Sequence, residues 1–183
     1  MSGKLRAEDV VKEILFDEEQ IREAIERCAQ WLGPIAERAD ATIFYSLEGG
    51  RKFASALDEI LSAGGVKKEY HPIKTSSYGY EQVSCGTVTI SGSLENNHIR
   101  GKNVVLLDDI LDSGRTMHTL KKIMTEKGAK QVSVCVLLER LTERPVDIQS
   151  DFSALQTERK EFFVGYGLDY KGQLRELDYI ATI

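Results

Sequence analysis

The stretch Asn103-Val104-Val105-Leu106-Leu107-Asp108-Asp109-Ile110-Leu111-Asp112-Ser113-Gly114-Arg115-Thr116 decides the fold of this chain. Its opening part, Asn103–Leu107, is an apolar run, as expected for a strand buried on both faces of a parallel sheet. Thr116–Glu126 predicts a helix with one apolar face and with Gly128 as its stop, and Gln131–Leu138 predicts a second buried strand. These elements form a strand–helix–strand unit, which predicts a right-handed parallel crossover.

A second unit of the same kind comes earlier in the chain. Ala41–Ser46 predicts a short strand, Phe53–Leu61 predicts a helix closed by Gly64-Gly65, and Lys67–Ile73 predicts another strand. Two such units predict an α/β fold in which helices flank a doubly wound, mainly parallel sheet.

The N-terminal part predicts one further helix, from Asp17 to about Gly33, because its apolar residues recur at helical spacing. Asp17 and Gln20 have the spacing of a capping box, and Pro34 is expected to end or kink the helix.

Two segments do not fit the sheet pattern. The region from Lys74 to about Leu94 is rich in Thr, Ser, Tyr and Gly with weak periodicity, which indicates a long loop or a mobile hairpin. A loop of this length in a compact domain favours a functional lid. Residues 139–183 hold only short apolar pieces, which we expect to form a small hood together with the N-terminal segment. The 183 residues therefore predict a single domain, with a core at about 36–138.

Composition excludes several classes of protein. The formal net charge of -5 and the pI near 5.3 argue against a nucleic-acid or anionic-membrane surface. No run is long or apolar enough to cross a bilayer, and the charged first residues do not form a signal peptide. Three separated cysteines fit small core residues in a reducing compartment better than a disulfide or zinc framework. We therefore expect a cytoplasmic protein without nucleic-acid or membrane partners.

The residues between the buried strand and its helix carry the chemistry. Ligands of open α/β sheets bind outside the carboxyl ends of the strands, where this segment falls. The unpaired N–H groups from Ser113 to Thr116 form an anion cradle at the helix start. Asp108 and Asp109 close the strand and suit sugar hydroxyls or a hard cation. An ordinary strand followed by a capped helix remains an alternative, and no phosphate-loop motif of nucleotide hydrolases or GxGxxG fingerprint accompanies the acids.

The complete string Asp108–Thr116 resembles the signature with which type I phosphoribosyltransferases bind phosphoribosyl pyrophosphate (PRPP). Within that superfamily, Lys74–Gly79 looks like the flexible-loop motif of hypoxanthine-guanine phosphoribosyltransferases. Phe162–Tyr170, followed by Arg175, looks like the purine-recognition and C-terminal segment of the same family. The similarity covers about Ile43 to the C-terminus and implies the type I phosphoribosyltransferase fold.

The resemblance implies a purine salvage enzyme that converts PRPP and a 6-oxopurine to a nucleoside 5′-monophosphate and pyrophosphate. The base would be hypoxanthine or guanine, with xanthine as a further option, and the products IMP or GMP. It also implies Mg²⁺ as cofactor and a homodimer or homotetramer.

The family's roles can be carried over position by position. Asp112 would be the acid–base residue at the purine N7, although as a residue type it could also be a helix N-cap. Asp108 and Asp109 would contact the ribose hydroxyls directly or through Mg²⁺, and Asp169 would help to place the metal. The remaining residues form groups. Those expected at the 5′-phosphate are Ser113, Gly114, Arg115 and Thr116; at the pyrophosphate Leu47, Glu48, Gly49 and Arg175; on the lid Ser77 and Tyr78; and at the base Arg140, Phe162, Phe163 and Asp169.

Two positions depart from the family pattern. The pyrophosphate loop usually reads Leu-Lys-Gly, often with a cis peptide before the Lys, and here Glu48 replaces that Lys. The Lys that donates to the 6-oxo group is replaced by Arg140, which can donate to a carbonyl but has a different shape. An ordinary surface position for Arg140 remains an alternative at this stage. We expect the three histidines, which share no ligand spacing, to be bystanders.

Two other functions stay open. The chain could be a non-catalytic sensor of PRPP or nucleotide that has kept the fold, since both departures fall at ligand-binding positions. A phosphoribosyltransferase for another base is the weaker alternative, because Phe162–Asp169 looks like a purine segment. The salvage enzyme is the prediction of choice.

Overall fold

The computed structural model describes residues 5–77, 88–91 and 94–183, with the backbone alone for 75–77 and 88–91. Its centre is a six-stranded sheet in the order β4-β3-β2-β5-β6-β7. All neighbours are parallel except β4, which is antiparallel to β3. The strands are β2 (Ala41–Leu47), β3 (Tyr70–Ser77), β4 (Val88–Ser91), β5 (Asn103–Leu111), β6 (Gln131–Arg140) and β7 (Phe152–Thr157). The predicted doubly wound α/β fold is confirmed.

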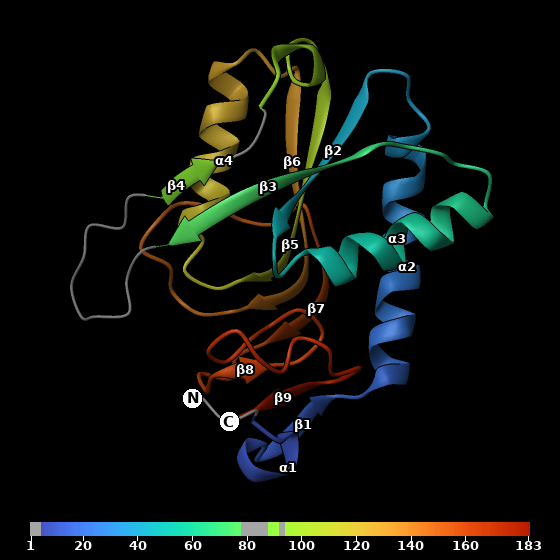
Figure 1. Ribbon diagram of the computed structural model, residues 1–183. Coiled ribbons are helices and arrows are strands. Elements are labelled where there is room, and N and C mark those ends of the chain that lie inside the picture. Colours follow the sequence, from blue (N-terminus) through green and yellow to red (C-terminus); the bar gives the residue numbers. More distant parts are fainter. Residues whose placement is uncertain (1–4, 78–87, 92–93) are drawn as a thin grey trace.

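Helices cover both faces of this sheet (Figure 1). Buried residues of α2 (Glu18–Ala36) and α3 (Arg51–Ala63) form one apolar cluster with the sheet, which includes Phe53 and Leu107. A second apolar cluster, which includes Phe44, lies on the other face. Buried residues of α4 (Arg115–Glu126) belong to it, as does Ile99, which directly follows the short helix η1 (Asn96–His98). Burial of apolar residues on both faces explains the unbroken apolar runs of the central strands.

A small hood packs at one end of the sheet, below β7 in the view of Figure 1. Its three strands, β1 (Glu13–Phe16), β9 (Ile180–Thr182) and β8 (Phe163–Val164), pair in that order, and α1 (Ala7–Val10) precedes them. The hood therefore joins the N-terminal and C-terminal segments, as expected. It is smaller than expected, however, because β6 runs on to Arg140 and β7 joins the main sheet, so the core extends beyond residue 138.

The boundaries of two strands also differ from the predictions. β3 begins at Tyr70 and reaches Ser77, and its last four residues pair with β4, so part of the expected lid is a strand pair. β5 continues through Asp108 and Asp109 to Leu111, because β6 supplies hydrogen-bonding partners along this whole length. Acidic residues disfavour a strand by themselves, and here the tertiary pairing outweighs that preference.

The start of helix α2 was predicted correctly from its capping residues, and its end nearly so from Pro34. The Asp17 side chain accepts from the Gln20 N–H, and the Gln20 side chain accepts from the Asp17 N–H, which completes the predicted capping box. Pro34 lies inside the helix, which ends two residues later at Ala36, so the break falls slightly after the expected position.

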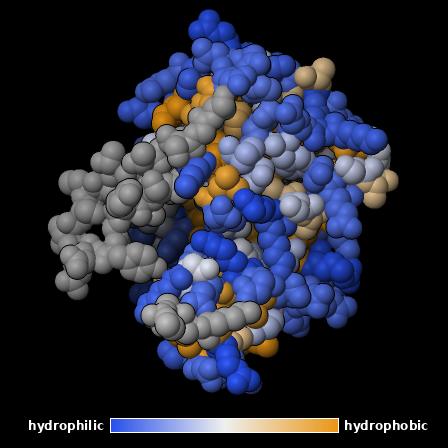
Figure 2. Space-filling model, in the orientation of Figure 1, coloured by the Kyte–Doolittle hydropathy of each residue, from blue (hydrophilic) through white to orange (hydrophobic). Residues whose placement is uncertain are grey.

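The visible surface is mostly hydrophilic, with apolar residues in separate patches on the face shown in Figure 2. Small scattered patches of this kind are normal for a globular protein. Among the residues that the structure describes, no helix is long and apolar enough to span a membrane.

Candidate active site

Two neighbouring cavities open at the carboxyl ends of the strands, and Asp112 lines both of them. The first, of about 280 Å³, is bordered by the ends of β2 and β5, the start of α4 and Arg175. The second, of about 470 Å³, is lined by the residues Asp112, Arg140, Thr142, Glu143, Lys160, Glu161 and Phe162. A larger groove of about 630 Å³ lies between α4 and residues 147–151, but neither the paired acids nor the start of α4 borders it. The two cavities therefore form the candidate site.

The start of α4 forms one wall of the first cavity. Gly114 is the residue before the helix and adopts a left-handed conformation with φ of 74°, which glycine tolerates best. A Cβ atom at this position would lie 2.3 Å from the Ile148 side chain, so there is no room for a larger residue. The turn leaves Ser113 exposed and puts the first N–H groups of α4 at the cavity. This arrangement suits an anion such as a phosphate.

Asp108 and Asp109 form the floor of the first cavity. The Ser46 hydroxyl donates to Asp108 Oδ1, which also accepts from the Asp109 N–H at 3.0 Å. Burial raises the pKa of Asp108, and the neighbouring carboxylate of Asp109 raises it further. Burial also raises the pKa of Asp109, although hydrogen bonds and Arg175 act against this. Two adjacent carboxylates repel each other when both are ionised. A bound cation or donating sugar hydroxyls would stabilise their negative charge.

The loop after β2 forms the opposite wall. The peptide bond between Leu47 and Glu48 is cis, as often found in the family, and Glu48 pairs with Arg51 at 3.4 Å. Gly49 lies directly against Asp109: a Cβ atom on Gly49 would be 2.0 Å from the Asp109 carboxylate. The Gly49 carbonyl in turn lies against Gly167, where a Cβ atom would approach it to 2.2 Å. The loop is thus packed between β5 and the hood.

The hood contributes a charged pair at the rim. Arg175 donates to the Gly167 carbonyl at 2.6 Å and pairs with the Asp169 carboxylate at 2.6 Å. Arg175 lines the first cavity, whereas Asp169 reaches it only through this pair. The first cavity is thus lined by Gly49, Asp108, Asp109 and Arg175, and Asp169 is joined to it through Arg175.

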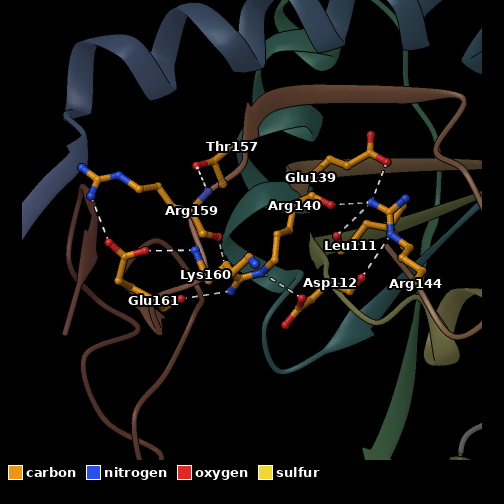
Figure 3. A network of polar contacts seen from close by, with 9 residues as sticks. All are labelled: Leu111, Asp112, Glu139, Arg140, Arg144, Thr157, Arg159, Lys160 and Glu161. Carbon is orange, nitrogen blue, oxygen red and sulfur yellow. Dashed lines mark hydrogen bonds and ion pairs between the residues drawn. The ribbon is translucent and has the colours of Figure 1, made fainter. Parts of the chain in front are cut away.

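Arg140 is a buried residue of the second cavity, so the alternative of an ordinary surface position is wrong. Its side chain is only 10% exposed, and its guanidinium lies 4.3 Å from the centre of the Phe163 ring. The two terminal nitrogens donate to the carbonyls of Arg159 and Glu161, the latter at 3.1 Å (Figure 3). Nε lies 2.8 Å from Asp112 Oδ1, an ion-pair distance, although its N–H is not aligned for a hydrogen bond.

The two adjacent phenylalanines face different surroundings. Phe162 is 49% exposed at the second cavity, with its ring edge-on to Tyr170, whereas Phe163 is buried in the core of the fold. An exposed aromatic ring beside a polar cavity offers a stacking surface to a planar ligand. The predicted roles, a side-chain platform for Phe162 and a backbone contact for Phe163, are compatible with this placement.

Comparison with known proteins agrees with this site. Residues 12–171 match the model of the phosphoribosyl transferase domain. The chain belongs to this family. Among curated relatives, the hypoxanthine-guanine phosphoribosyltransferase of Streptococcus thermophilus is 30% identical over 94% of this chain and 93% of the relative. The bifunctional protein TilS/HprT of Listeria monocytogenes is 31% identical over 94% of this chain, which spans only 26% of that protein.

Solved structures of the family are similar in fold. The hypoxanthine phosphoribosyltransferase of Staphylococcus aureus superposes with a TM-score of 0.85 at 26% identity, over 96% of this chain and 93% of that one. A Trypanosoma cruzi hypoxanthine phosphoribosyltransferase mutant, solved as a ternary complex with substrates, gives 0.84 at 26% identity over 96% of both chains. Both structures show that the fold of this chain is that of solved phosphoribosyltransferases.

One arginine of this phosphoribosyltransferase was missed from the sequence. Arg144 donates to the backbone carbonyls of Leu111 (3.4 Å), Asp112 (3.1 Å) and Arg140 (2.8 Å), and pairs with buried Glu139 at 2.8 Å (Figure 3). It also donates to the Ile148 carbonyl at 3.5 Å. It therefore ties the segment between β5 and α4 to the end of β6. A single Arg in the polar run after β6 carries no signal that could have revealed this role.

The flexible-loop prediction falls at the end of the described part of β3 and on residues outside it. Ser77 is the last residue of β3, and only its backbone is described, whereas Tyr78 lies outside the described residues.

Proposed function

We propose that this phosphoribosyltransferase converts PRPP and a 6-oxopurine base to the nucleoside 5′-monophosphate and pyrophosphate. The observation that carries the proposal is the position of Asp112, which lines both the cavity with the phosphate-binding features and the cavity with the aromatic platform. A group that exchanges a proton with the base during transfer to the sugar must lie between the two substrates. The described residues contain no feature that specifically favours the non-catalytic alternative.

The pairing of Asp112 with Arg140 supports a 6-oxopurine rather than adenine. N7 and the 6-substituent are neighbours on one edge of a purine. A carboxylate beside a guanidinium presents an acceptor and a donor 2.8 Å apart, which suits a protonated N7 beside a 6-oxo group. Adenine would place its amino group, a donor, against the donor Arg140. Guanine, hypoxanthine and xanthine share this edge, so this contact does not rank them.

The chain's own residues would act as follows. Ser113, Gly114, Arg115 and Thr116 bind the 5′-phosphate through hydroxyls and the N–H groups of the helix start. Gly49 and Arg175 meet the pyrophosphate, and Phe162 stacks on the base. Asp112 accepts the N7 proton as the bond between the base and the ribose forms. Glu48 contributes no positive charge to the pyrophosphate.

Mg²⁺ is the cofactor in this proposal. The oxygen donors of Asp108 and Asp109 suit a hard cation, and the buried acids would be stabilised by its charge. Asp169 would join them once Arg175 turns from it to the pyrophosphate. When bound with PRPP, Mg²⁺ stabilises the negative charge that develops on the leaving pyrophosphate. The cytoplasmic location and the homodimer or homotetramer remain predictions.

The test is nucleotide formation from PRPP and Mg²⁺ with hypoxanthine, guanine, xanthine and adenine offered separately. We expect a nucleoside monophosphate from at least one 6-oxopurine and none from adenine. The Asp112→Asn variant serves as a control for contaminating activity. PRPP binding without product from any base would refute the proposed enzyme and favour a sensor.

A further inference from the structure

The structure brings together two histidines that the sequence separates. The rings of His71 on β3 and His98 on η1 have centroids 4.2 Å apart, and Glu69 lies beside them. One ligand atom from each of the three residues, an imidazole nitrogen or a carboxylate oxygen, lies within 4.8 Å of the other two. The prediction that the three histidines are bystanders rested on their sequence spacing, which did not reveal that His71 and His98 lie close together.

The fold explains why these side chains meet. Among the described residues, β4 pairs with Lys74–Ser77, and the first residues of β3 have a strand partner only on the β2 side. Glu69 directly precedes β3, and its carboxylate lies beside the ring of His71, the second residue of the strand. The neighbouring Ile99 is fully buried in the core cluster that contains Phe44, which anchors His98 against the edge. His71 also contacts Phe44, with ring centroids 5.1 Å apart.

We propose that Glu69, His71 and His98 bind a divalent transition metal ion such as Zn²⁺. Two imidazoles and one carboxylate match the three-ligand sets that hold zinc while leaving one position for water. Mg²⁺ prefers oxygen ligands, so this site is chemically different from the acidic pair of the active site.

Only modest movement is needed. In a tetrahedron with metal–ligand bonds of about 2.0–2.1 Å, ligand atoms lie about 3.3 Å apart. Glu69 is exposed and can rotate toward the two half-buried rings. The ion would connect the edge of β3 to η1.

The chain offers a direct test because it contains only three histidines. His118 lies on α4, where its ring contacts the Asp147 carbonyl at 3.3 Å, and it serves as an internal control. Zn²⁺ would be titrated into the full-length protein while the imidazole ¹⁵N and ¹H resonances of all three histidines are recorded. We expect His71 and His98 to respond together at one equivalent and His118 to remain unchanged.

Calorimetric titrations of His71→Ala, His98→Ala and the matched control His118→Ala complete the test. Loss of either ligand should weaken Zn²⁺ binding by more than about tenfold, the loss that outer-shell partners alone can cause. His118→Ala should bind as the wild type does. The proposal is overturned if Zn²⁺ leaves the His71 and His98 resonances unchanged, or if the three variants bind it equally. Nucleotide formation plays no part in these readouts, so they are independent of the proposed enzyme activity.

Discussion

Replacing Arg140 by Met removes the guanidinium while keeping an unbranched side chain against Phe163. Two carbonyls, those of Arg159 and Glu161, lose a charged donor, and Asp112 loses its ion-pair partner. Hydrogen bonds to charged groups contribute about 1.5–3 kcal/mol each. Residues 159–161 are partly exposed, so water can replace some of the lost hydrogen bonds to these carbonyls. The Asp112 carboxylate is 55% exposed, so water can also solvate it when the ion pair is lost. We therefore expect the free energy of unfolding to fall by about 2–3 kcal/mol.

The same variant should lose activity with 6-oxopurines. If Arg140 donates to the 6-oxo group, loss of one charged hydrogen bond of about 1.5–3 kcal/mol corresponds to a roughly 10- to 150-fold lower kcat/KM. Arg140→Lys is the matched control, because an ammonium keeps a donor but cannot reach both carbonyls and Asp112. It should lose stability while keeping kcat/KM within about tenfold.

The assays are chemical denaturation and steady-state formation of nucleotide from hypoxanthine and from guanine. Measuring both properties separates a structural role of Arg140 from recognition of the base. If Arg140→Met is folded and keeps the wild-type kcat/KM with both bases, the assignment of Arg140 to the 6-oxo group is incorrect.

Three further predictions follow from the site. Asp112→Asn should lower kcat by about 10²–10⁴-fold, the usual contribution of an acid–base group, while calorimetry shows unchanged PRPP binding; full activity would leave Asp112 as a structural residue only. Gly49→Ala puts a Cβ atom 2.0 Å from the Asp109 carboxylate and should cost about 1–3 kcal/mol of stability and weaken PRPP binding. The control is Gly33→Ala inside α2, where the nearest atom to the added Cβ is in the Leu61 side chain, 3.6 Å away. Chemical denaturation should show this variant to be as stable as the wild type or more stable, and equal losses in the two variants would contradict the packing argument. Because burial raises the pKa of Asp108, the folded protein without metal retains a proton that the unfolded chain has released above its ordinary pKa of 3.8. The free energy of unfolding should therefore fall as pH rises through the raised pKa, and Asp108→Asn should reduce this dependence in denaturation curves collected across pH; an unchanged slope would refute it.

The elements predicted best were those with signals inside one short segment. The apolar runs of β5 and β6 and the apolar face of α4 predicted the central crossover, and Asp17 with Gln20 marked the start of α2. The acids and the helix start of the proposed PRPP-binding segment are also neighbours in the chain. Such features depend on periodicity, burial and capping, which act over a few residues.

Contacts between distant segments could not be predicted from such local patterns. Pairing with β6 extends β5 through Asp108 and Asp109, and pairing with β6 also draws β7 out of the expected hood. Arg140 was matched to a base-binding position by resemblance, yet its burial and its contact with Asp112 depend on where β6 ends relative to β5.

The sequence by itself therefore determined the class of fold, the strand–helix–strand units and the segment proposed to bind the phosphate, because each is encoded by residues close together in the chain. Only the tertiary structure decided that Asp112 borders two cavities, that Arg144 ties that segment to β6, and that His71 meets His98. These arrangements arise where separate strands and helices pack against one another, and no local pattern specifies which distant side chains that packing brings into contact.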